Sequence, residues 1–138
     1  MSDQIKNQAE QTFKNHLSCL TEGRITDWIN LFAENAVMEV PYSPKAFPNR
    51  IEGREGLYEY MKDIPKLFKI EYKNIHFHPT AEPNLVIVEF ECTGKVLTTN
   101  KPYDQKYISV ITLNNDGKIV KYVDYWNPVV ALEALGMG

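Results

Sequence analysis

The chain divides near Pro65 into a part with helical periodicity and a part with strand periodicity, and this division limits the folds open to it. Before Pro65, apolar residues recur at spacings of three and four, as in amphipathic helices. After Pro65, β-branched and aromatic residues dominate four segments that are separated by turn residues. Helices followed by a run of strands predict an α+β fold, in which helices pack on one side of a strongly curved antiparallel sheet.

The part before Pro65 contains three expected helices and one expected strand. In chain order these are a helix over 4–23, a short helix over 27–35, a strand over 36–42 and a helix over 54–64. Gly23 is expected to end the first helix, and Thr26 is placed to cap the second. Pro65 is expected to break the third helix.

The part after Pro65 contains four expected strands and a short tail. The strands cover 68–79, 85–97, 105–113 and 118–126. The stretch "NNDGK" between the last two is typical of a β-hairpin turn, and the tail after Trp126 is expected to form a closing turn or short helix. No internal repeat or linker interrupts these elements. One domain over 1–138 is therefore expected.

Charge and composition argue against several function classes. The net charge is −3, and the 15 basic residues are spread along the chain without a basic run, so nucleic-acid binding is not expected. Apolar runs are short and interrupted by charge, and the N-terminus lacks the apolar stretch of a signal peptide, so no membrane association is expected. Cys19 and Cys92 lie far apart without a CxxC pair, which indicates reduced thiols in a cytoplasmic protein.

The stretch "YVDYWNP" places an aspartate among aromatic residues at the end of the last expected strand. With the period of two of a strand, Tyr122, Asp124 and Trp126 share one face, and a face with two aromatic residues usually turns inward. A carboxylate in an aromatic-lined cavity loses hydration, so its pKa is expected to rise towards the range of a general base or acid. The alternative is that Asp124 caps a backbone N–H or pairs with a lysine at a solvated rim.

His76 and His78 share one face of the expected strand 68–79, and two histidines at this spacing can bind a metal. Zinc needs at least a third ligand, and no HxxxH or cysteine partner is near, so no metal site is expected. One of the two can instead transfer protons together with a carboxylate. Alternation does not decide which one faces inward, because a one-residue register shift turns both to the other face. Surface positions close to Pro79 are the alternative.

Four stretches carry a resemblance to a known family: "LFAENAVMEVPY", "IEGREGLYEYM", "NNDGKIVKYVDYWNP" and "ALEALG". They resemble the SnoaL-like branch of the nuclear transport factor 2-like superfamily, and within it the proteins related to the phenazine-biosynthesis A/B pair. The resemblance covers nearly the whole chain. It implies a cone-shaped fold in which helices and the concave face of the sheet enclose one apolar cavity. Fold alone does not name a reaction, because the superfamily includes isomerases, cyclases, dehydratases and non-catalytic binding proteins.

Comparison within this superfamily separates two kinds of proton-transfer machinery. Ketosteroid isomerases place their base on the first strand, at the position that reads Val40 here, and valine cannot carry a proton. Their two oxyanion donors fall at His16 and Ser109, which also depart from the isomerase pattern. SnoaL-like cyclases keep an acidic residue on the last strand, and Asp124 matches that position. The resemblance and the alternation of the strand therefore favour the same carboxylate.

Several further side chains are candidates to act with Asp124. Dehydratase and dehydrohalogenase relatives pair an aspartate with a histidine on a nearby strand, which suggests His76 or His78. His16, at the isomerase tyrosine position, can hydrogen-bond a bound carbonyl or can be a boundary residue. Tyrosines suit the orientation of a flat, oxygenated ligand, and core packing is the alternative for each of them. The expected substrate-binding residues are Val40, Tyr42, Tyr107, Ser109, Tyr122 and Trp126.

The function expected from these features is a SnoaL-like small-molecule enzyme of the isomerase, cyclase or condensation type. It would transfer a proton on a carbonyl-containing cyclic or aromatic substrate in an internal pocket, and that chemistry needs no cofactor. The alternatives are a non-catalytic ligand-binding protein with the same pocket and a protein-interaction module. A deep cavity beside Asp124 favours the enzyme or the ligand-binding protein, and a filled cone favours the protein-interaction module. Relatives also suggest a homodimer formed through the outer face of the sheet.

Overall fold

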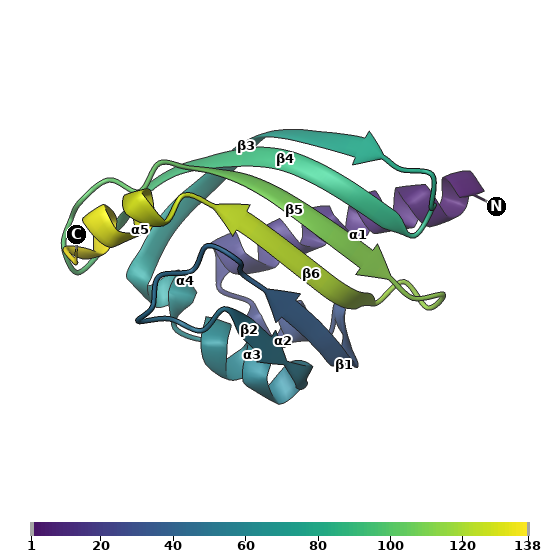
Figure 1. The fold of residues 1–138 in the computed structure, drawn as a ribbon, viewed down its shortest axis with the longest axis horizontal. Helices are drawn as coiled ribbons and strands as arrows, with labels where there is room; N and C mark the ends of the chain where they lie inside the picture. The colour runs from purple at the N-terminus through teal and green to yellow at the C-terminus, as the bar shows by residue number, and fades with distance from the viewer. Residues whose placement is uncertain (1, 138) are drawn as a thin grey trace.

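The computed structural model describes residues 2–137, in which a six-stranded sheet curves around the helices (Figure 1). Figure 1 shows the long strands arching over α1, with α3 and α4 below and α5 at the end away from the N-terminus. The strand order is β2-β1-β6-β5-β4-β3. In chain order the elements are α1 (Ser2–Glu22), α2 (Ile25–Ile29), β1 (Phe32–Glu39), β2 (Arg50–Glu52), α3 (Gly53–Met61), α4 (Ile64–Leu67), β3 (Phe68–Pro79), β4 (Leu85–Val96), β5 (Gln105–Leu113), β6 (Ile119–Trp126) and α5 (Pro128–Leu135).

The α+β fold predicted from the order of helices and strands is confirmed, with one difference in the sheet. Four of the five strand pairs are antiparallel, whereas β1 and β6 run parallel. The four strands predicted after Pro65 agree with β3 to β6 within one residue at each end. The predicted hairpin turn is also present, because Gly117 has a φ of 77° and its N–H donates to the carbonyl of Asn114 at 3.0 Å.

The helix α1 packs its apolar stripe against the concave face of the sheet. Ala9, Phe13 and Leu17 recur every four residues and are all buried. The ring of Phe13 meets the rings of Phe77 and Phe90 edge to face, at centroid distances of 5.8 and 5.1 Å. Each buried side chain of this size contributes about 2 kcal/mol to folding. α1 is therefore fixed against β3 and β4, which positions its polar residues relative to the sheet.

The second helix is shorter than predicted, because the chain enters the sheet at Phe32. α2 has only five residues, and the stretch 32–35, which the sequence pattern assigns to the helix, forms the start of β1. Phe32 is fully buried and pairs with Ile119 of β6, so packing against the sheet overrides helix propensity here. The predicted Thr26 cap is wrong, since Arg24 precedes the helix and no side chain caps it.

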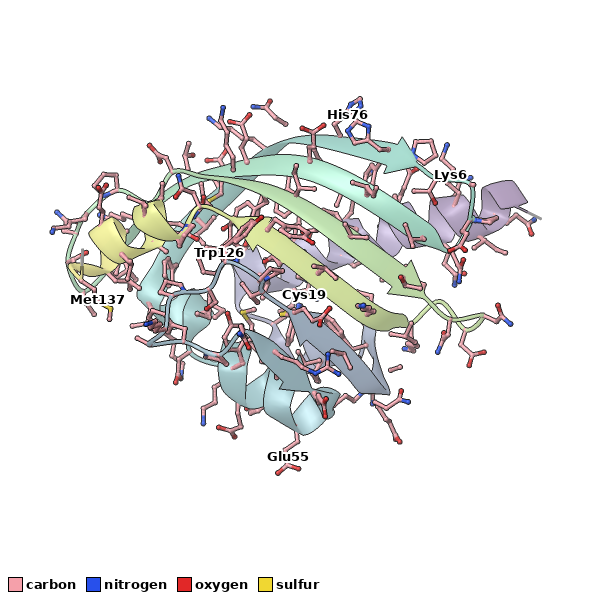
Figure 2. All side chains as sticks on the ribbon, in the orientation of Figure 1. Lys6, Cys19, Glu55, His76, Trp126 and Met137 are labelled. Atoms are coloured by element: carbon pink, nitrogen blue, oxygen red, sulfur yellow. The ribbon has the colours of Figure 1, made fainter. Side chains whose placement is uncertain are left out.

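A β-bulge in β3 decides which residues of that strand face the helices. Tyr72 faces inward, and the pairing of β3 with β4 then shifts by one residue around Asn74, whose φ is 56°. Beyond the bulge Phe77 faces inward, and His76 and His78 point to the outer face of the sheet. Figure 2 shows His76 above β3, pointing away from the helices. The prediction that one of these two histidines acts beside Asp124 is therefore wrong.

The helices α4 and α5 are short: α4 contains Pro65, and α5 follows Asn127. Pro65 ends the third predicted helix early, and α4 begins as a separate turn with this proline near its start. The tail forms α5, as predicted, where the side chain of Asn127 accepts the N–H of Val129 and Gly136 ends the helix in the left-handed region. Among residues 2–137, no helix combines the length and the apolar character needed to cross a bilayer.

Candidate active site

A cavity of about 370 Å³ lies between the concave face of the sheet and the surrounding helices. Its walls come from α1, α3, α4, α5, from β1 and β3 to β6, and from the loop before β2, so it draws on nearly every element of the fold. This volume is in the range of small-molecule sites. The cavity is mostly apolar and aromatic, and the polar side chains in its lining are His16, Tyr60, Asp63, Tyr72, Tyr103, Tyr107, Tyr122, Asp124 and Trp126.

Asp124 lies in the wall of this cavity, between Tyr122 and Trp126 on the inner face of β6. Ser109 is its direct neighbour on β5, and the Ser109 hydroxyl donates to Oδ1 of Asp124 at 2.9 Å. Burial raises the pKa of Asp124 from 3.8 to about 7, and hydrogen bonds from Ser109 and Trp126 partly oppose this rise. The structure thus places the carboxyl in the cavity rather than at a solvated rim.

A chain of buried hydrogen bonds connects Asp124 to α2. The indole Nε1–H of Trp28 donates to Nδ1 of His16 at 2.8 Å, and Nε2 of His16 lies 3.1 Å from the Tyr122 hydroxyl. The Tyr122 hydroxyl is 2.9 Å from that of Ser109, which contacts Asp124. Burial lowers the pKa of His16 to about 3, so its ring is neutral at physiological pH.

In this series of hydrogen bonds, each donor points towards Asp124. An indole nitrogen can only donate, so Nδ1 of His16 accepts and the neutral ring carries its proton on Nε2. The Nε2–H of His16 therefore donates a hydrogen bond to the hydroxyl oxygen of Tyr122. Ser109 has a single hydroxyl hydrogen, which it gives to Asp124, so Tyr122 donates its own hydrogen to Ser109. The hydroxyl of Ser109 is therefore fixed as a donor to the carboxyl.

Three further tyrosines line the cavity that were not among the expected site residues: Tyr60, Tyr72 and Tyr103. Burial raises the pKa of Tyr60 and of Tyr103 to about 12, and it also raises that of Tyr72, so all three stay protonated near neutral pH. The negative charge of Asp124 adds to each of these shifts. The Tyr103 hydroxyl lies 3.2 Å from that of Tyr107. The cavity thus presents several phenol groups around the carboxyl of Asp124.

The remaining predicted substrate-binding residues divide into three groups. Tyr107, like Tyr122 and Trp126, lines the cavity as expected from strand alternation. Val40 and Ser109 are buried but do not line it, because Val40 packs in the core and Ser109 lies behind Asp124. The expectation that these two residues contact a substrate in the cavity is therefore wrong.

Tyr42 is wrong as an inward-facing residue, since 60% of its surface is exposed. β1 ends at Glu39, and the chain turns at Pro41 and Tyr42, so the alternation of the strand no longer applies there. The Tyr42 ring instead packs against Tyr125 on the outer face of β6, at a centroid distance of 5.7 Å. Tyr42 and His76 border a shallow depression on that face.

No metal centre accompanies these groups in the described part of the chain. Among the side chains of residues 4–137, no three His, Cys, Asp or Glu residues gather closely enough to hold an ion. Cys19 and Cys92 are both buried free thiols, and burial raises the pKa of each. The ionisable groups available to a cavity ligand are therefore Asp124 and the tyrosines, with Asp63 near α4.

Comparison with known proteins identifies relatives over most of the chain. The sequence profile of the SnoaL-like domain matches residues 13–122. The uncharacterised protein YesE of Bacillus subtilis is 43% identical over 130 residues, which cover 94% of this chain and 88% of YesE. An uncharacterised PhzA/B-like protein of Pseudomonas aeruginosa is 36% identical over 93% of this chain and 90% of its own length.

Solved structures agree with these sequence relatives. A Bacillus subtilis protein described as a proposed isomerase is 41% identical, with a TM-score of 0.92 over 97% of this chain and 96% of that one. More distant structures, described as a polyketide cyclase and as an epoxide hydrolase/cyclase-like enzyme, share 14% and 18% identity at TM-scores of 0.79 and 0.77. At that identity they show the common fold. The match of sequence profile, relatives and fold means that the chain belongs to the SnoaL-like family, with the cone-shaped nuclear transport factor 2-like fold.

Proposed function

We propose that this protein is a cofactor-free proton-transfer enzyme that acts on a cyclic or aromatic carbonyl compound, with Asp124 as the base. The observation that supports this most is the carboxyl of Asp124 in an aromatic cavity, with its pKa raised to about 7 by burial. A base with a pKa near the working pH combines a useful ionised fraction with a strong tendency to take a proton. The relative described as a proposed isomerase and the cyclase-type neighbours agree with this class of chemistry.

The proposed reaction begins when ionised Asp124 removes a proton from a carbon next to the substrate carbonyl. The C–H bond breaks, its electron pair forms the C=C bond of an enolate, and negative charge moves to the carbonyl oxygen. In an isomerisation, protonated Asp124 returns the proton to a different carbon of the same system. In a ring closure, the enolate carbon attacks a second carbonyl, and the proton passes from Asp124 to the new alkoxide.

The hydrogen-bond chain behind Asp124 has a positioning role in this proposal. The Ser109 hydroxyl holds Oδ1 at 2.9 Å, and Trp126 gives the carboxyl a second hydrogen bond, so these two side chains orient it in the cavity wall. Tyr122 and His16 fix the direction of the Ser109 hydroxyl. A buried donor that stabilises the carboxylate also keeps its pKa from rising further. These hydrogen bonds therefore set both the orientation and the basicity of the Asp124 carboxyl.

The test is hydrogen–deuterium exchange of 2-tetralone, a bicyclic ketone with an acidic methylene group, followed by NMR in D₂O. The wild-type protein should exchange this methylene faster than buffer alone. Asp124→Asn should lose about 10²–10⁴-fold of the protein-dependent rate, which is the usual contribution of a general base. Glu71→Gln, at an exposed position of β3, is the matched control and should exchange like wild type. Exchange at the buffer rate, or an undiminished rate in Asp124→Asn, would remove the proposed role.

A non-catalytic binding protein remains the second candidate, and the same cavity favours it. It differs from the enzyme in one measurable respect, because a binder would take up the ketone without accelerating exchange. Titration calorimetry with 2-tetralone, run beside the exchange assay, separates the two. Binding with exchange identifies the enzyme, and binding without exchange identifies the binder.

A further inference from the structure

We propose that the cavity selects an uncharged, carbonyl-bearing cyclic ligand over a carboxylate or phosphate of the same shape, and that the hydroxyls of Tyr60 and Tyr72 donate to its oxygen. This inference rests on the proposed function, because it names the class of ligand for the Asp124 site. Two separate observations carry it. The first is the set of charges in the cavity wall, and the second is a pair of tyrosine hydroxyls that have no protein partner.

The charged groups in the cavity wall disfavour an anionic ligand. As formed by the side chains of residues 4–137, the lining contains two carboxyl groups, those of Asp124 and Asp63, and neither lysine nor arginine. The side chain of Asp63 is 61% exposed and pairs with Lys66 at 3.9 Å, so the charge that a ligand meets inside the cavity is that of Asp124. An anion that enters must give up its water and approach Asp124 without a compensating cation. Both steps are unfavourable, so a carboxylate should bind poorly when Asp124 is ionised.

The arginines of β2 and α3 are engaged outside the cavity. Arg50 forms ion pairs with Glu39 and Glu52 at 3.1 and 2.9 Å. Arg54 donates to the backbone carbonyl of Phe32 at 2.8 Å. His16 does line the cavity, but it is neutral and both of its ring nitrogens already have partners within the protein. Among the residues that the structure describes, no cation is therefore positioned in the wall to receive a carboxylate or a phosphate.

The hydroxyl groups of Tyr60 and Tyr72 are free to hydrogen-bond a ligand. In the part of the chain that the structure describes, neither hydroxyl makes a hydrogen bond to protein, whereas those of Tyr103, Tyr107 and Tyr122 all do. Neither is sealed in the protein interior as an orphaned polar atom. Both side chains line the cavity, and both lie close enough to Asp124 to feel its charge.

The two hydroxyls are protonated near neutral pH, because burial raises the pKa of each tyrosine, so each can donate to a ligand oxygen. A carbonyl oxygen accepts two such bonds through its two lone pairs. The same bonds become stronger as the oxygen gains negative charge. A ketone placed here would have its oxygen on the tyrosines and its acidic carbon towards Asp124. Charge exclusion and the two donors therefore select the same kind of ligand.

The test compares three ligands of one shape by titration calorimetry at pH 8.5. They are 2-tetralone, tetralin-2-carboxylate, and 2-methylenetetralin, in which a methylene group replaces the ketone oxygen. Wild type should bind the ketone at least about tenfold more tightly than the carboxylate. Asp124→Asn, which removes the opposing charge, should reduce this preference. In the double variant Tyr60→Phe/Tyr72→Phe, the ketone should bind about three- to tenfold more weakly or worse, whereas the hydrocarbon should bind as before.

Three results would overturn the inference. They are equal or tighter binding of the carboxylate by wild type, no detectable binding of the ketone, and an unchanged ratio of ketone to hydrocarbon affinity in the double variant. Circular dichroism and thermal unfolding of each variant establish that the fold is retained. Ligand selectivity does not require turnover. If the protein shows the predicted selectivity but no deuterium exchange, the ligand class is supported and the proposed reaction is rejected. If it exchanges deuterium but prefers the carboxylate, the proposed reaction is supported and the ligand class is rejected.

Discussion

Replacing Asp124 by asparagine is expected to stabilise the folded protein, and the gain is expected to grow with pH. Burial raises the pKa of this carboxyl from 3.8 to about 7, so near pH 5 or 6 the folded protein holds a proton that the unfolded chain has released. Because the folded state binds more protons, its stability falls as pH rises from about 4 to about 7, and the full penalty applies above pH 7. Asparagine has the same shape and can still accept from Ser109, but it does not titrate.

The size of this effect follows from the two pKa values. They differ by about three pH units, and each unit corresponds to about 1.4 kcal/mol, so the penalty in wild type approaches about 4 kcal/mol at high pH. At pH 5 the unfolded carboxyl is already mostly ionised, and about 2 kcal/mol of the penalty is present. The stabilisation by Asp124→Asn should therefore increase by about 2–3 kcal/mol between pH 5 and pH 8.5.

Urea unfolding of both proteins at pH 5 and pH 8.5 measures this difference directly. Other titrating groups act equally on wild type and variant, so they cancel in the comparison. Glu71→Gln removes the same charge from an exposed position and should show no comparable increase. If the stabilisation by Asp124→Asn were the same at both pH values, the carboxyl would not be held in a desolvated site, and the reasoning from the cavity would fail.

Three further predictions concern the surroundings of the site. His16, whose pKa burial lowers to about 3, should give the long-range ¹H–¹⁵N NMR pattern of a neutral Nε2–H ring down to pH 5, and a charged ring at that pH would contradict its burial. Trp28→Phe should lower the free energy of unfolding by about 1–3 kcal/mol, because Nδ1 of His16 loses its hydrogen-bond donor. Urea unfolding that shows no difference in stability between Trp28→Phe and wild type would refute this. Asn74 has a φ of 56°, so Asn74→Val should lower the free energy of unfolding by about 1–2 kcal/mol, whereas Asn74→Gly should be tolerated. Equal thermal unfolding of the two variants would show that the bulge does not need this backbone conformation.

The sequence predicted the order of elements because periodicity and turn residues are local signals. Alternation in β6 also placed Asp124 correctly beside Tyr122 and Trp126, since no irregularity interrupts that stretch of the strand. The start of β1 was missed, because residues 32–35 read as a continuation of a helix and only pairing with β6 draws them into the sheet. Long-range pairing of this kind leaves no local trace in a single sequence.

The site residues were predicted less well, and β3 shows why. Alternation puts Tyr72 on one face with His76 and His78, and a single bulge at Asn74 separates them. Asparagine tolerates a positive φ but does not require one, so the bulge could not be located in advance. Tyr72 itself did carry a usable signal, because it alternates with the apolar Phe68 and Ile70 ahead of the bulge.

The central claim is that Asp124 removes a proton from a ketone in the cavity, and its most direct test is the pH dependence of kcat/KM for exchange of 2-tetralone. That quantity reports the ionisation of the free enzyme's base. For wild type, kcat/KM above the buffer rate should rise with pH and level off near pH 7, where the carboxyl becomes ionised. This inflection should be absent in Asp124→Asn. A wild-type profile that is already level at pH 5, or an inflection near pH 7 that persists in Asp124→Asn, would contradict the claim.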